Sequence, residues 1–99
     1  MNLGLLLHQS GRLADAERTY RAALLACGDD ATLHFNLAVL LEDLERRAEA
    51  LQSYRAALES DPGMADAHYN LALVCERIGK PRDAIRHMAQ YRRLLGAAR

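Results

Sequence analysis

The chain has 99 residues, of which 51% are hydrophobic and 5% aromatic, and its formal net charge at pH 7 is zero. This length suits a single domain over residues 1–99, and the balanced charge argues against a protein built mainly to hold nucleic acid. Leu and Ala dominate while β-branched residues are scarce, which favours helices over sheets. We therefore expect an all-α protein.

The first half of the chain predicts helices separated by short breaks. An apolar first helix ends at a turn around Ser10-Gly11, and a second helix contains the string YRAAL at 20–24. Asp29 or Asp30 can cap a third helix that runs to about Leu44, because short acidic side chains accept hydrogen bonds from the first backbone N–H groups of a helix. Its apolar residues recur at three- and four-residue spacings, as on one buried helix face.

The second half predicts three more helices. One runs from about Arg47 to Ser60 and ends at Asp61-Pro62-Gly63, because proline cannot continue a helix. The next runs from about Met64 to Ile78. After a turn at Gly79-Lys80, the last helix opens with Pro81, a residue that fits the first turn of a helix.

The sequence repeats itself at a spacing of 34 residues. Residues 1–30 share twelve identities with residues 35–64, and YRAAL recurs intact at 54–58. A third copy begins at Ala65, where HFNLAVLLED (34–43) becomes HYNLALVCER (68–77). No gap is needed in these alignments. A sustained period of 34 residues is typical of tetratricopeptide arrays.

The repeats also resemble the tetratricopeptide family residue by residue. The second copy carries Leu37-Ala38, Ala50, Tyr54, Ala57 and Pro62 at the family's small, aromatic and terminal positions. The resemblance implies a right-handed α-solenoid of three antiparallel hairpins, with repeats at about 1–30, 31–64 and 65–96 and the first truncated at its N-terminus. Two departures stand out: Glu45 replaces the turn glycine, and Tyr91-Arg92 replace Ala-Leu, which should block a further standard repeat.

In this family the first helix of each repeat lines the concave groove, so the resemblance implies a set of binding positions by number. In the first copy these include Leu5, His8 and Gln9, and Thr32 belongs to the second. The candidate site consists of Asn2, Phe35, Asn36, Val39, Glu42, Asp43, Asp66, Tyr69, Asn70, Leu73, Glu76 and Arg77.

Asparagine recurs at one groove position of every copy, as Asn2, Asn36 and Asn70. An amide donates and accepts hydrogen bonds, so a row of them can pair with the backbone of an extended peptide. This row resembles the asparagine ladder of the protein O-GlcNAc transferase superhelix. The alternative is that each amide binds the neighbouring helix of its own chain.

The other groove positions indicate the kind of partner. Apolar side chains bordered by the acidic Glu42, Asp43, Asp66 and Glu76 favour a partly apolar peptide that carries basic residues. The carboxylate clamp of chaperone-binding family members needs Lys and Arg at groove positions. Here those positions hold Thr32, Phe35, Asp66 and Tyr69, so we expect no clamp.

We expect no enzyme activity, cofactor or metal site, because no phosphate loop, HExxH motif or nucleophile elbow occurs. His34 and His68 occupy the same repeat position, too far apart to share a metal, and are expected to pack or form hydrogen bonds. The sequence identifies no partner for His8 or His87. Cys27 and Cys75 form neither a metal-ligand spacing nor a disulfide framework, and Cys75 is expected to be buried.

The expected function is a protein–protein interaction module that binds a peptide or extended segment in the groove. The alternative is self-association, through the apolar run at residues 3–7 and through opposite charges of about −5 over residues 29–61 and +5 over 76–99. The basic last helix could also contact nucleic acid, but a solvated face explains it better. We recognise no signal peptide or membrane-spanning stretch and expect a cytoplasmic protein with a protein or peptide partner.

Overall fold

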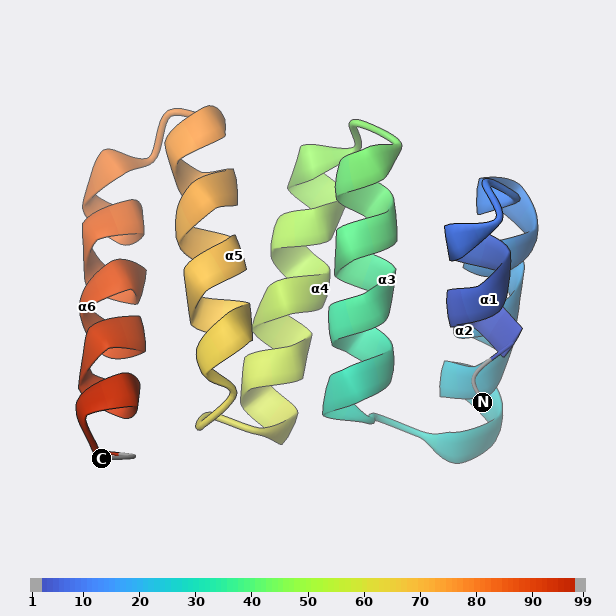
Figure 1. Cartoon of the computed structure of the whole chain (residues 1–99), viewed down its shortest axis with the longest axis horizontal. Coiled ribbons are helices and arrows are strands. Elements are labelled where there is room, and N and C mark those ends of the chain that lie inside the picture. The colour runs from blue at the N-terminus through green and yellow to red at the C-terminus, as the bar shows by residue number, and fades with distance from the viewer. Residues whose placement is uncertain (1–2, 98–99) are drawn as a thin grey trace.

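The computed structural model describes residues 3–97 and shows consecutive helices that pack in pairs as antiparallel hairpins (Figure 1). The hairpins stack side by side along the longest axis of the molecule, which measures 35 Å, so that the two chain ends lie at opposite ends of the stack. The expected all-α solenoid is confirmed. Its helices are α1 (Leu3–Gln9), α2 (Leu13–Cys27), α3 (Ala31–Asp43), α4 (Arg47–Ser60), α5 (Ala65–Arg77) and α6 (Pro81–Ala97).

The helix ends follow from local sequence. Of the two candidate caps for α3, Asp30 serves: its backbone is extended and its carboxylate accepts a hydrogen bond from the Leu33 N–H at 3.0 Å. Helix α4 begins and ends where the sequence predicts, just before Asp61 and Pro62. Helix α6 opens with Pro81, whose missing N–H is not needed in a first turn.

The turn inside each hairpin adopts one repeated geometry. The second residue after the first helix has a positive φ in all three hairpins, at 80° for Gly11 and Gly79 and 61° for Glu45. In the second hairpin the Glu45 N–H donates to the Glu42 carbonyl at 2.9 Å and the Arg46 N–H donates to the Leu41 carbonyl at 2.8 Å. This double closure ends a helix in the left-handed region, which favours glycine. Glu45 therefore carries a conformation that its side chain disfavours.

The buried core consists of two tyrosine rings packed with leucine side chains and small residues. Tyr20 and Tyr54 are fully buried, and Cys75 is buried as the sequence predicts. A Cβ atom placed on Gly4 would lie 2.5 Å from Cε1 of Tyr20, so α1 can approach this ring only because the residue has no side chain. The other core residues are Ala16, Leu37, Ala38, Leu40, Leu41, Ala50, Leu51, Leu71 and Val74.

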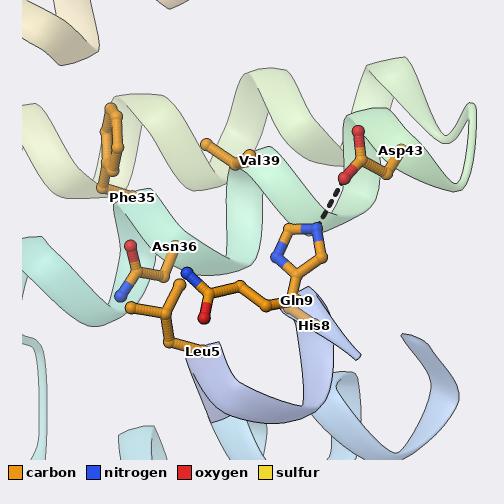
Figure 2. Close-up of a pocket in the computed structure, with 7 residues that line it drawn as sticks. All are labelled: Leu5, His8, Gln9, Phe35, Asn36, Val39 and Asp43. Carbon is orange, nitrogen blue, oxygen red and sulfur yellow. Dashed lines mark hydrogen bonds and ion pairs between the residues drawn. The ribbon is translucent and has the colours of Figure 1, made fainter. Parts of the chain in front are cut away.

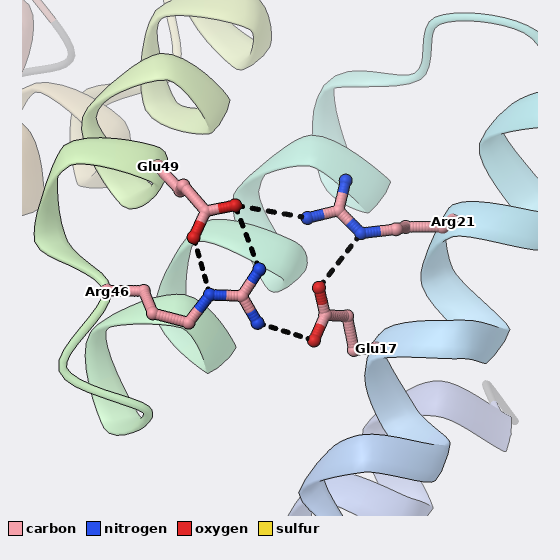
Figure 3. A network of polar contacts seen from close by, with 4 residues as sticks. All are labelled: Glu17, Arg21, Arg46 and Glu49. Carbon is pink, nitrogen blue, oxygen red and sulfur yellow. Dashed lines mark hydrogen bonds and ion pairs between the residues drawn. The ribbon is translucent and has the colours of Figure 1, made fainter.

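A polar network joins the first and second hairpins (Figure 3). Arg46 of the second hairpin donates to Glu17 of α2 at 2.7 Å and to Glu49, while Arg21 bonds Glu17 at 2.9 Å. The hydrogen bond from Arg46 lowers the pKa of the Glu17 carboxyl below its ordinary value, although partial burial opposes the shift. One repeat later Leu51 replaces Glu17 and is buried, so the second junction is apolar at this position.

The two ends of the stack differ. At the N-terminal end Leu3, Leu6 and Leu25 are 58%, 45% and 90% exposed. At the C-terminal end the Tyr91 ring of α6 packs on Tyr69 of α5, with ring centroids 5.0 Å apart. The Tyr91 ring therefore turns back onto its own hairpin.

Candidate binding groove

A hollow of about 440 Å³ opens between α1 and α3 on the side formed by the first helices of the hairpins (Figure 2). Its lining comes entirely from positions that the repeat alignment assigns to the groove. These are Leu5, His8 and Gln9 from α1, with Phe35, Asn36, Val39 and Asp43 from α3.

The walls of this hollow combine apolar surface with two amides. Phe35 is held in orientation by an edge-to-face contact with Tyr54, with centroids 5.8 Å apart and planes at 65°. In Figure 2 the side chains of Leu5 and Gln9 lie toward Asn36, while Val39 separates Phe35 from the polar end of the site. An apolar surface with a few polar groups is the usual character of a ligand site.

One end of the hollow is closed by a histidine–carboxylate pair. Nε2 of His8 lies 2.5 Å from Oδ2 of Asp43, which joins α1 to α3 (Figure 2). The His8 side chain is 12% exposed, whereas that of Asp43 is 54% exposed. The sequence did not reveal this partner for His8, because α1 and α3 meet only in the folded chain. Asp43 therefore presents a carboxylate at the edge of the hollow.

The next junction holds Glu42 inside the fold. The Tyr54 hydroxyl donates to Oε2 of Glu42, and Arg77 of α5 donates to Oε1 at 3.1 Å. Burial raises the pKa of Tyr54 well above its ordinary value and the Glu42 carboxylate raises it further, while a hydrogen bond with Asn70 opposes both. Glu42 thus links three helices and is half-buried, whereas the other acidic positions expected at the rim, Asp43, Asp66 and Glu76, are exposed.

The equivalent tyrosine of the first repeat has different surroundings. The Tyr20 hydroxyl is buried and finds no hydrogen-bond partner within residues 3–97. His8 stands where Glu42 stands in the next repeat, but its Nε2 is directed to Asp43. Burial raises the pKa of Tyr20. The first junction consequently lacks the hydrogen bond that fixes the second.

The predicted positions of the third copy lie away from the hollow. Asp66, Tyr69 and Glu76 are exposed on α5, whereas Leu73 and Asn70 are half-buried. Asn70 approaches the Tyr54 hydroxyl, so this amide serves a neighbouring helix, while Asn36 lines the hollow. Asn2 lies outside the residues that the structure describes. The row of asparagines therefore contributes one described amide to the hollow itself.

The remaining histidines are held by local contacts. Nε2 of His34 lies 3.0 Å from Asp29, and Nδ1 of His68 lies 3.3 Å from Nδ1 of His87. His87 thus has a partner that the sequence did not reveal, because residues on α5 and α6 meet only after folding. Burial and the neighbouring His68 lower the pKa of His87. Within residues 3–97 no group of three or more side chains could hold a metal ion.

No helix in the described part of the chain is long and apolar enough to cross a membrane. The expected cytoplasmic location stays a prediction, as does the division into repeats at about 1–30, 31–64 and 65–96.

Comparison with known proteins identifies the architecture. Two models described as tetratricopeptide repeat match the chain, one over residues 35–98 and one over residues 1–33. No curated protein matches the sequence significantly.

Solved structures of MamA are similar to the chain along nearly its whole length. MamA MSR-1 is 26% identical with a TM-score of 0.89, covering 98% of this chain and 56% of that one. MamA AMB-1 is 27% identical with a TM-score of 0.85, covering 93% and 54%. MamA from Desulfovibrio magneticus RS-1, at 19% identity and a TM-score of 0.89, shares the fold and covers 95% and 53%.

The chain thus spans about half the length of these MamA structures. The repeat models cover more than half of the sequence, and the hairpin stack agrees with them. The chain belongs to the tetratricopeptide repeat family, whose stacked hairpins serve as scaffolds for protein–protein interaction.

Proposed function

We propose that the surface formed by α1, α3 and α5 binds an extended peptide segment of a partner protein. The observation that carries the proposal is the hollow between α1 and α3, whose apolar wall of Phe35 and Val39 is flanked by the amides of Gln9 and Asn36. Apolar walls accommodate side chains, and amides pair with the donors and acceptors of an unpaired backbone. The hollow is open at its surface, as an extended segment requires.

A displayed library of random peptides tests this proposal. Gln9→Arg places a long charged side chain at the hollow, and Gln52→Arg is its matched control because Gln52 is also exposed but lies on α4. We expect enriched peptides to bind the native protein and the Gln52→Arg variant but to lose affinity for Gln9→Arg. Circular dichroism establishes that each variant remains helical. An absence of enriched peptides, or equal binding by both variants, refutes the proposal.

The role of the amide is tested separately. Asn36→Ala removes donor and acceptor from the hollow without adding bulk. If Asn36 pairs with the peptide backbone, every enriched peptide should lose affinity for the variant regardless of its side chains, because backbone contacts are sequence-independent. Loss for a single peptide would instead indicate a contact with one side chain.

Self-association is the second candidate function. The observation in its favour is the apolar surface at the ends of the stack, where Leu3, Leu25 and Ile85 are 58%, 90% and 72% exposed. Light scattering at several protein concentrations, at low and high salt, decides the point. A mass that rises with concentration, and falls in Leu25→Ser, supports association through the N-terminal end. A constant monomer mass removes this candidate.

A further inference from the structure

Two ion pairs bridge the first helices of neighbouring hairpins at equivalent positions. His8 and Glu42 stand one repeat of 34 residues apart, and so do their partners Asp43 and Arg77. His8 meets Asp43 at 2.5 Å, and Glu42 meets Arg77 at 3.1 Å. The two pairs thus occupy equivalent positions with reversed charges. In the first pair the carboxylate belongs to the later residue, Asp43, and in the second pair it belongs to the earlier residue, Glu42.

The exposed members of the two pairs, Asp43 and Arg77, carry opposite charges. The inner side chains of His8 and Glu42 are 12% and 16% exposed, whereas Asp43 and Arg77 are each 54% exposed. A segment that lies along the groove therefore meets a carboxylate at the first junction and a guanidinium at the second. If each of the three hairpins takes one third of the 35 Å stack, the two charges are about 12 Å apart, which an extended chain covers in about three to four residues.

The two exposed charges are compensated to different degrees. Arg77 faces the carboxylate of Glu42, which also accepts a hydrogen bond from the Tyr54 hydroxyl and is held in place by it. Asp43 faces an imidazole, which carries a charge only when it is protonated. A cation at Asp43 therefore gains more Coulomb energy than an anion at Arg77.

The hollow beside Asp43 also fits the shape of a basic side chain. Phe35 and Val39 line the hollow together with Asp43. A lysine or arginine can lay its aliphatic stem on these apolar groups while its charged end reaches the carboxylate. At the other junction, the positive charge of Arg77 would repel a second cation.

We propose that the groove selects a bipolar segment, with a basic residue opposite Asp43 and an acidic residue three to four positions away opposite Arg77. The inference rests on the proposed peptide-binding function and adds the charge pattern of the partner. Asp43 is the main determinant, because its charge is the less compensated one. The acidic residue contributes less, and two basic residues at this spacing bind more weakly than one of each sign.

The test uses the strongest peptide from the display library, resynthesised with Lys or Glu at two positions three residues apart. We expect one mixed order to bind most tightly by fluorescence anisotropy. Replacing its Lys by Gln should weaken binding about three- to fivefold, and replacing its Glu by Gln about twofold, as for partly exposed ion pairs. These differences should shrink at high salt, because exposed charges are screened.

Protein variants assign the two charges to their positions. Asp43→Asn should abolish the advantage of Lys over Gln but leave that of Glu, and Arg77→Gln should do the reverse. The exchanged variant Asp43→Arg/Arg77→Asp, if circular dichroism shows it to be helical, should prefer the opposite order of charges.

The outcomes separate the two proposals. A library without enriched peptides overturns the binding function and the inference together. Peptides that bind but do not distinguish Lys–Glu from Lys–Lys or Gln–Gln overturn the charge pattern alone and leave the groove in place. A preference for Lys that survives in Asp43→Asn overturns the assignment of the basic residue to Asp43.

Discussion

Replacing Glu45 by glycine should stabilise the protein. Glu45 has a φ of 61° at the turn between α3 and α4, where the first and third hairpins have glycine at 80°. Its backbone makes the same two closing hydrogen bonds as Gly11 and Gly79 do in their turns. The substitution therefore leaves the turn geometry unchanged and removes the side chain, whose Cβ atom the left-handed region disfavours.

The expected gain is the difference of two backbone terms. A residue with a Cβ atom loses roughly 1–2 kcal/mol in the left-handed helical region. Glycine offsets about 0.5–1 kcal/mol of this gain, because it loses more conformational freedom than other residues when the chain folds. The net stabilisation is about 0.5–1 kcal/mol, which corresponds to a rise in Tm of roughly 2–8 °C for a domain of this size.

Urea and thermal unfolding followed by circular dichroism measure this gain. Glu45→Ala is the matched control, because it removes the carboxylate from the C-terminal end of α3 but keeps a Cβ atom. Gly79→Ala is the reverse experiment: a Cβ there meets nothing within 4 Å, so any loss of stability comes from the backbone. If Glu45→Gly is no more stable than Glu45→Ala, backbone strain at this turn is not a significant term.

Three further predictions concern the core and the junctions. Gly4→Ala should lower the free energy of unfolding in urea by about 1–3 kcal/mol, because the new Cβ would lie 2.5 Å from the buried Tyr20 ring. Gly96→Ala, with open space around it, should be neutral or stabilising. Equal effects of the two substitutions would contradict this packing. Tyr54→Phe should destabilise the protein by about 1.5–3 kcal/mol, because the hydrogen bond to Glu42 is lost. Tyr20→Phe should be neutral or stabilising, because its hydroxyl has no hydrogen-bond partner in the described chain. Equal losses of stability in thermal unfolding would refute this difference. Finally, the pKa of Glu17 is lowered in the folded state, so its contribution to stability is present above the ordinary pKa of 4.5 and disappears as the pH falls below it. The free energy of unfolding, measured from pH 7 to 3, should therefore decline less in Glu17→Gln than in the native protein. Parallel curves would argue against the Arg46 contact.

Much of the architecture could be read from local sequence. The 34-residue period placed the hairpins, and the helix limits followed from Asp30, Pro62 and Pro81, whose effects on the backbone are local. The family resemblance, carried along the repeat, implied the residues that line the hollow, since equivalent positions of a repeat face the same side. Glu45 was recognised as a departure, but its positive φ appeared only in the folded turn.

The sequence by itself determined the class of fold and the number of hairpins, because helix periodicity and helix-terminating residues act over a few positions. Tertiary structure alone decided which side chains meet across the junctions. Glu42 turned inward to Tyr54 and Arg77, His8 found Asp43, and His68 found His87. Such pairs join residues that are 12 to 35 positions apart, and their geometry depends on how neighbouring hairpins stack rather than on any local pattern.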